Sequence, residues 1–143
     1  MKILMVCLGN ICRSPLAEGI LKSKISDNHV VESAGTIDMH EGNQPDKRSI
    51  EVAKKHGIDI SSQKSKHIQS SDLDNYDLVF CMDKNNLKDV KSLATNEKQI
   101  QKISLVLDNS EVPDPYWGKA DDFEDVFQLL DKACDEIVKN LKQ

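Results

Sequence analysis

A short apolar run that ends in a glycine-containing loop opens the chain and constrains its fold more than any other feature. Residues 3–6 are apolar, and the sequence VCLGNICRSP leads the chain out of this run. The run is short and ends at Leu-Gly-Asn, so it predicts a buried strand rather than a helix. Ser14 and Pro15 are typical of a helix start, because proline is tolerated in the first turn. The opening therefore predicts a strand, a loop and a helix in succession.

The same alternation continues along the chain. The pattern predicts further strands at 29–33, 78–82 and 103–107, and further helices at 46–56, 83–93 and 123–141. Strands that alternate with helices imply right-handed crossovers and a parallel sheet covered on both faces, which is an α/β fold. Ligands bind such sheets at the carboxyl ends of the strands, where the loop after residue 6 falls.

Composition and charge limit the possible partners and location. A chain of 143 residues is expected to form one domain over residues 1–143. The net charge of -5 disfavours binding to a nucleic-acid backbone, and no apolar run is long enough to suggest a membrane partner. The first apolar run is also too short for a signal peptide. We therefore expect a cytoplasmic protein whose four cysteines are thiols.

The loop after the first strand carries residue types that bind anions. Gly9 and Asn10 tolerate unusual backbone angles, so successive N–H groups can point inward ahead of the helix N-terminus. Arg13 is one of only two arginines among 19 basic residues, and its guanidinium can bind phosphate through two hydrogen bonds. These surroundings favour the thiolate of Cys7, which we predict to be a nucleophile with Ser14 as a hydrogen-bond donor. The alternative is an inert cysteine at the end of a buried strand.

A second segment offers an acid. A thiolate that attacks a phosphoester needs a proton donor for the leaving oxygen. Asp114 lies between two prolines, and Tyr116 and Trp117 follow at once. We predict that Asp114 is this acid and that the aromatic residues form walls for an aryl phosphate. The alternative is a proline-rich turn whose aromatic side chains only pack.

Together these segments resemble the low-molecular-weight protein tyrosine phosphatases. The resemblance covers nearly the whole chain, through VCLGNICRSPLAE, SAGT from Ser33, CMD from Cys81 and DPYWG from Asp114. It implies a three-layer α/β fold with a four-stranded parallel sheet, helices on both faces and a phosphate-binding loop after the first strand. It further implies hydrolysis of phosphotyrosine and of small aryl phosphates, with no metal and no organic cofactor.

The resemblance also implies a role for each matching residue. Cys7 becomes a phosphocysteine, Arg13 binds the phosphate, and Asp114 acts first as general acid and then as base. The implied phosphate-binding residues are Leu8, Gly9, Asn10, Ile11, Cys12, Arg13 and Ser14. The loop would be supported by Asn10, Ser14 and Ser33, and the substrate cleft would be lined by Met39, Tyr116 and Trp117. Expected partners are phosphotyrosine-containing proteins or peptides, and inorganic phosphate or similar oxyanions in the loop.

Some positions depart from the family pattern. Met39 stands where an aromatic wall residue is common, and Gln63 stands where a histidine is common. His40 and His67 are interpreted as surface residues.

Cys12 suggests redox regulation, because its family counterpart can form a disulfide with the nucleophile. The hypothesis is that oxidants reversibly silence the enzyme by joining Cys7 to Cys12. The alternative is that Cys12 is packed and inert.

Three other functions remain alternatives. A protein arginine phosphatase of this family carries threonine before the second loop cysteine, where this chain has Ile11. Arsenate reductases need a cysteine relay, and Cys81 stands where the first relay cysteine would fall. The second would fall near Lys88, but no cysteine lies between Cys81 and Cys134. A phosphate-binding module without catalysis would lack the nucleophile or the acid, and both are present.

Overall fold

The computed structural model describes residues 1–141 and contains a parallel sheet with helices on both faces. The strands are β1 (Lys2–Cys7), β2 (Val30–Gly35), β3 (Leu78–Cys81) and β4 (Ile103–Leu105), in the spatial order β2-β1-β3-β4. The helices are α1 (Arg13–Lys24), α2 (Lys47–Lys55), α3 (Asp72–Asn75), α4 (Lys84–Lys91), α5 (Glu97–Gln101) and α6 (Ala120–Leu141). Every strand pair is parallel. The predicted three-layer α/β fold with four parallel strands is confirmed.

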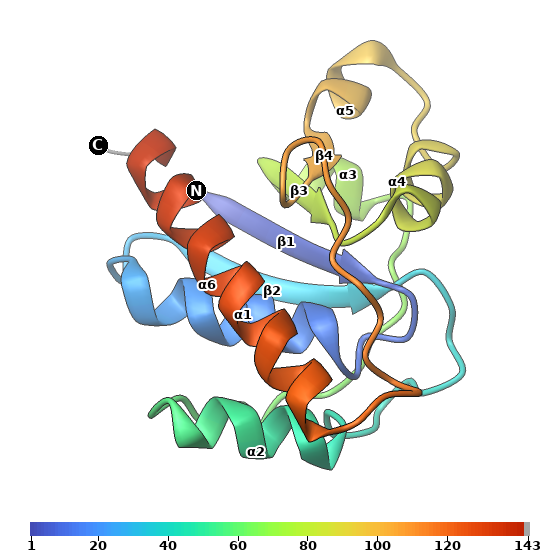
Figure 1. Cartoon of the computed structure of the whole chain (residues 1–143). Helices are drawn as coiled ribbons and strands as arrows, with labels where there is room; N and C mark the ends of the chain where they lie inside the picture. Colours follow the sequence, from blue (N-terminus) through green and yellow to red (C-terminus); the bar gives the residue numbers. More distant parts are fainter. Residues whose placement is uncertain (142–143) are drawn as a thin grey trace.

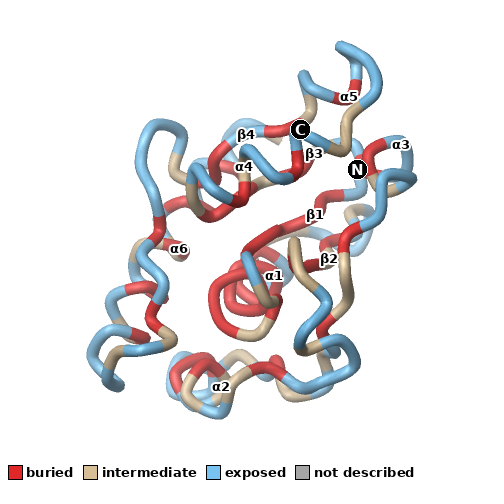
Figure 2. The backbone as a smooth tube through the Cα atoms, turned by 90° about the vertical axis from the view of Figure 1, so that its right-hand side faces the viewer, coloured by how far each residue is buried: buried red, intermediate tan, exposed pale blue. Residues whose placement is uncertain are grey.

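Two hydrophobic cores separate the sheet from its two helical layers. Ile3 and Met5 of β1 belong to the core shared with α1, α2 and α6, whereas Leu4 and Val6 belong to the core shared with α3 and α4. This division follows from the strand, because successive side chains point to opposite faces. Figures 1 and 2 show the two groups of helices on opposite sides of the strands, with the buried β1 between them.

The element boundaries differ from the predicted ones at several ends. The last strand stops at Leu105, two residues early, because a turn follows in which Asp108 has φ 69°. The predicted helix ends at 46 and 83 are caps: Asp46 and Asp83 accept hydrogen bonds from the first turns of α2 and α4. The helices α3 and α5 were not predicted, since four or five residues are too few to show a helical period.

The described part of the chain ends at residue 141. None of the helices in this part is both long and apolar enough to cross a membrane. The prediction of a single domain covers residues 1–143, and its last two residues lie outside the described part.

The carboxyl edge of the sheet gathers the segments that carry the predicted site. Cys7 ends β1 beside Gly35 of β2, and the loop that follows leads directly into α1. The segment before α6 returns to this edge, where the N–H of Val112 donates to the carbonyl of Met82 at 2.8 Å. Residues more than a hundred positions apart in the sequence are thereby brought together.

Candidate active site

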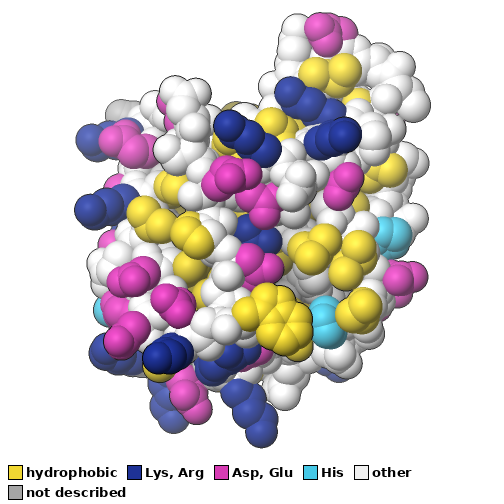
Figure 3. Space-filling view, turned by 45° about the vertical axis from the view of Figure 1, so that its right-hand side comes forward, with side chains coloured by type: hydrophobic (Ala, Val, Ile, Leu, Met, Phe, Trp, Pro, Cys, Tyr) yellow, Lys and Arg dark blue, Asp and Glu magenta, His cyan; other side chains and the backbone are white. Residues whose placement is uncertain are grey.

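A cavity of about 310 Å³ lies at this edge of the sheet, above the loop that follows β1. Its lining residues are Cys7, Leu8, Gly9, Ile11, Cys12, Arg13, Ile37, Met39, His40, Asp114, Tyr116 and Trp117. The structure therefore brings the three predicted catalytic residues to one cavity together with the three predicted cleft residues. Figure 3 shows hydrophobic side chains gathered beside a histidine on one face of the molecule. Met39 and Trp117 are strongly exposed, at 74% and 90%.

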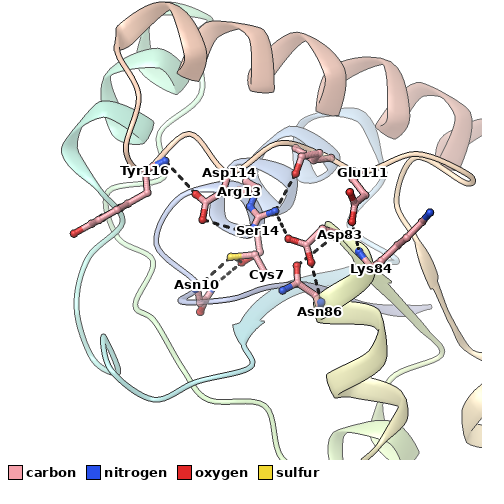
Figure 4. A network of polar contacts seen from close by, with 11 residues as sticks. Cys7, Asn10, Arg13, Ser14, Asp83, Lys84, Asn86, Glu111, Asp114 and Tyr116 are labelled. Atoms are coloured by element: carbon pink, nitrogen blue, oxygen red, sulfur yellow. Dashed lines mark hydrogen bonds and ion pairs between the residues drawn. The ribbon is translucent and has the colours of Figure 1, made fainter.

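The sulfur of Cys7 is buried and receives hydrogen bonds from its own loop. The backbone N–H of Asn10 donates to Sγ at 3.2 Å, and the hydroxyl of Ser14 lies 3.0 Å from it. This loop shape depends on Asn10, which has φ 56° and so occupies the left-handed region that few residue types tolerate. Figure 4 shows Asn10 and Ser14 beside the sulfur of Cys7.

The hydrogen-bond network behind the loop fixes the direction of the Ser14 hydroxyl. The side-chain nitrogen of Asn10 donates to Ser14 at 2.8 Å and to Ser33 at 2.9 Å, while its Oδ1 accepts from the N–H of Lys66. Ser33 in turn donates to the buried carboxylate of Glu18 at 2.6 Å. Ser14 is thus an acceptor toward Asn10, so its own proton can be donated to the sulfur of Cys7.

Arg13 is a buried cation whose orientation is set by two distant segments. Nη1 donates to Asp83 at 2.7 Å and to the carbonyl of Val112 at 2.9 Å. Asp83 is itself held as the N-cap of α4 by a reciprocal pair of hydrogen bonds with Asn86. Among residues 1–141, Nε and Nη2 have no hydrogen-bond partner. These donors remain for an oxyanion in the cavity.

Asp114 approaches the same cavity from the segment before α6. Its Oδ2 lies 3.8 Å from Nη2 of Arg13, and its Oδ1 accepts from the backbone N–H of Tyr116 at 3.0 Å (Figure 4). The side chain is 42% exposed, so it can reach both solvent and a bound ligand. The rings of Tyr116 and Trp117 meet edge to face with centroids 4.8 Å apart.

The structure corrects several details of the sequence analysis. Gly9 does not have a positive φ; a Cβ there would instead lie 2.9 Å from the ring of His40. His40 is therefore a wall of the cavity rather than a bland surface residue. His67 is half-buried, and its Nε2 lies 3.2 Å from the carbonyl oxygen of Thr36. Asn10 and Ser14 are not among the lining residues of the cavity, because the side chain of Asn10 donates to Ser14 and Ser33 and the hydroxyl of Ser14 lies against the sulfur of Cys7. Their assignment as phosphate-binding residues stays a prediction.

Gln63 and Ser33 lie away from the cavity lining. Gln63 donates to the carbonyl of Pro15 at 3.1 Å in α1. Ser33 accepts from the side chain of Asn10 at 2.9 Å, a contact that fits its predicted loop-supporting role. The role of Ser33 follows from its neighbours in space, since twenty-three residues separate it from Asn10.

Burial raises the thiol pKa of the three other cysteines. It raises the pKa of Cys12 to about 12, with nearby Asp46 as the second cause. It likewise raises the pKa of Cys81 and of Cys134 to about 12. These three thiols are poor nucleophiles at neutral pH, because the thiolate is the reactive form.

Some functional neighbours were missed by the sequence analysis. Asp83 accepts a hydrogen bond from Arg13, and Glu18 accepts one from Ser33. The backbone N–H of Lys66 donates to Asn10. Only Asp83 had a signal, because it belongs to the CMD motif. Within residues 1–141, no group of three His, Cys, Asp or Glu side chains is arranged to hold a metal ion.

The chain is similar in sequence and in structure to known proteins. The model of a family described as low molecular weight phosphotyrosine protein phosphatase matches residues 2–143. The chain is 36% identical to the human protein of that name, over 92% of this chain and 90% of the human one. A crystal structure of protein tyrosine phosphatase from Entamoeba histolytica superposes with a TM-score of 0.93 at 37% identity, covering 99% of this chain and 97% of the other. Vibrio vulnificus Wzb, solved in complex with benzylphosphonate, gives 0.89 at 32% identity and covers 97% of each chain.

Proposed function

Because the chain belongs to the low molecular weight phosphotyrosine protein phosphatase family, we propose that it hydrolyses phosphotyrosine in proteins or peptides through a phosphocysteine on Cys7. Its relatives confirm the prediction of an enzyme of the protein-tyrosine-phosphatase type. The observation that carries the mechanism is that Cys7, Arg13 and Asp114 meet at one cavity, although Asp114 is more than a hundred residues from the other two. Small aryl phosphates fit the same site, and inorganic phosphate or a similar oxyanion is expected to occupy the loop.

In the first step the thiolate of Cys7 attacks phosphorus. A sulfur–phosphorus bond forms, the bond to the tyrosine oxygen breaks, and Asp114 gives its proton to that oxygen. Arg13 stabilises the phosphoryl oxygens with its free donors, and we expect backbone N–H groups of the loop to share this task. The cavity that would hold the phosphoryl group is lined by Leu8, Gly9, Ile11 and Cys12.

In the second step water attacks the phosphocysteine. Asp114, now a carboxylate, takes a proton from the water, while the sulfur–phosphorus bond breaks and Cys7 leaves as thiolate. The Ser14 hydroxyl, aimed at the sulfur by Asn10, stabilises this departing charge. The cycle returns the enzyme to its starting state without a metal or an organic cofactor.

The test is hydrolysis of phosphotyrosine, phosphoserine and phosphoarginine peptides by the purified protein and by Cys7→Ser. Turnover of the phosphotyrosine peptide that is lost in Cys7→Ser supports the proposal. Preference for phosphoarginine would favour the arginine phosphatase, and full activity of Cys7→Ser would exclude the mechanism. An arsenate reductase is disfavoured because Cys81, the first relay position, is fully buried with a raised pKa.

Reversible oxidation is a second part of the proposal. Peroxide would convert the Cys7 thiolate to a sulfenic acid with release of hydroxide; the Cys12 thiolate would then attack that sulfur and displace a second hydroxide to form a disulfide. Because burial raises the pKa of Cys12 to about 12, this closure accelerates about tenfold for each pH unit between 7 and 10. Activity should return with dithiothreitol in the wild type but not in Cys12→Ser. Equal recovery in the variant would exclude the disulfide.

The proposal also covers the cellular location of the protein, which we infer to be the cytoplasm, and its domain organisation. All four cysteines are free thiols in the structure, which suits the cytoplasm. We also propose that residues 1–143 form a single domain, because α1 and α6 from the two halves of the chain share one core.

A further inference from the structure

Arg48, the second arginine of the chain, grips the segment that carries Asp114. Its Nη2 donates to the backbone carbonyl of Tyr116 at 2.9 Å, and its Nη1 donates to the carbonyl of Gly118 at 3.1 Å. A planar guanidinium holds two acceptors in fixed directions, which a lysine ammonium cannot do. The backbone after Asp114 is therefore attached at two points to the start of α2.

Asp46 anchors this guanidinium and connects it to the phosphate loop. Its two carboxylate oxygens accept from Nε and Nη2 of Arg48 at 3.0 and 2.9 Å. The hydrogen bond from Arg48 lowers the pKa of Asp46, so the pair stays ionised across the neutral range. The backbone N–H of Asp46 donates to the carbonyl of Ile11 at 2.8 Å. The ion pair between Asp46 and Arg48 thus connects the loop after β1 to the backbone segment that follows Asp114.

Aromatic side chains hold Arg48 in this orientation. Its guanidinium carbon lies 4.5 Å from the ring centroid of Phe123 and 5.7 Å from that of Tyr116. Contacts of this kind attract a cation to the face of the ring. The side chain is only 35% exposed despite its charge. A long side chain held by hydrogen bonds and by two rings has little freedom to move.

The connection reaches the carboxylate through a single residue. Tyr116 is bound by Arg48 at its carbonyl, and its N–H donates to Oδ1 of Asp114 at 3.0 Å. The only other polar contact of Asp114 within residues 1–141 is the 3.8 Å approach to Arg13. Because the carboxylate is otherwise exposed, its position depends on the backbone that Arg48 holds.

We propose that Arg48 is a positioning residue for the general acid, placing Asp114 for proton transfer to the leaving oxygen. This inference rests on the proposed function, in which Asp114 is that acid. Proton donation matters most for a poor leaving group, such as the tyrosine phenol with a pKa of about 10. It matters less for 4-nitrophenyl phosphate, whose phenol is more acidic. Loss of Arg48 should therefore damage the two reactions unequally.

The experiment compares kcat/KM for a phosphotyrosine peptide and for 4-nitrophenyl phosphate. Arg48→Lys keeps the positive charge but loses the planar guanidinium that binds two acceptors. Its kcat/KM should fall about tenfold for the peptide and about twofold for the aryl phosphate. In an Asp114→Asn background, Arg48→Lys should cause no further loss on either substrate. Lys47→Met is the matched control, because it removes a charge from an exposed neighbour in the same helical turn.

Equal losses on the two substrates, or a further loss in the Asp114→Asn background, would overturn the inference and leave Arg48 as a structural residue. Arg48→Met provides a second variant, and thermal unfolding together with phosphate inhibition shows whether the fold and the phosphate loop are intact. Failure of the proposed function is seen separately, in the wild type and in Cys7→Ser. If Asp114→Asn itself spared the peptide reaction, both the acid assignment and this inference would be wrong.

Discussion

Replacement of Asn10 separates the two tasks of this residue, its backbone angle and its side-chain hydrogen bonds. Asn10 is buried, has φ 56°, donates to Ser14 and Ser33, and accepts from the N–H of Lys66. Glycine keeps the left-handed backbone but loses all three side-chain contacts. Alanine loses the same contacts and must also adopt a strained angle. The two variants therefore lose the same side-chain contacts and differ in the free-energy cost of the left-handed backbone angle.

The expected losses follow from these contacts. Two buried hydrogen bonds and one part-buried hydrogen bond contribute about 3 kcal/mol in total, so Asn10→Gly should lower the free energy of unfolding by about that amount. Alanine in the left-handed region costs about 1 kcal/mol more, so Asn10→Ala should be less stable by that difference. Both variants lose the group that directs the Ser14 hydroxyl to the sulfur. Their kcat/KM should fall together, by roughly 10- to 100-fold.

Urea unfolding, kcat/KM for an aryl phosphate and inhibition by inorganic phosphate test this reasoning. Asn109→Ala, in an exposed turn, is the control and should change none of the three. The reasoning fails if glycine and alanine are equally destabilising, because the left-handed angle would then carry no cost. It also fails if either variant retains wild-type kcat/KM.

Two further predictions concern ion pairs. Asp83→Asn should lower the free energy of unfolding by about 2–3 kcal/mol in urea melts, because the buried Arg13 loses its partner while asparagine still caps α4. Retention of wild-type stability would contradict this role. Hydrogen bonds from Gln128 and then His56 lower the pKa of Glu124 to about 2. Glu124→Gln should therefore be less stable than wild type at pH 7, and the difference should shrink as pH falls from about 4.5 toward 2. A difference that grew on acidification would refute this sign.

Much of the fold could be predicted because its signals lie between near neighbours in sequence. The apolar run to Cys7, the proline at 15 and the helical spacing of α6 each depend on residues a few positions apart, and the alternation of such elements indicates a parallel sheet. Where the signal was short, prediction failed: α3 and α5 are four and five residues long, and β4 ends early.

The chemistry of the loop was also visible locally, whereas the orientation of its groups was not. Cys7 and Arg13 stand six residues apart, so their residue types predict an anion site. Of the two residues that tolerate unusual backbone angles, Asn10 adopts one and Gly9 does not. A Cβ at Gly9 would lie 2.9 Å from the ring of His40, thirty-one residues away. No local pattern indicates that Asp83 and the carbonyl of Val112 hold Arg13, or that Arg48 holds the segment of Asp114.

For this protein, the residue order alone specified the α/β architecture and the presence of a thiol and a guanidinium in the loop that follows the first strand. Those features come from backbone sterics and from the spacing of apolar side chains over short stretches of sequence. The relation of Asp114 to Cys7, the direction of the Ser14 hydroxyl and the grip of Arg48 arose only in the folded chain. Each depends on the strand order β2-β1-β3-β4 and on the side chains that pack against the sheet. The relative positions of these groups are set by tertiary contacts between segments that are remote in sequence.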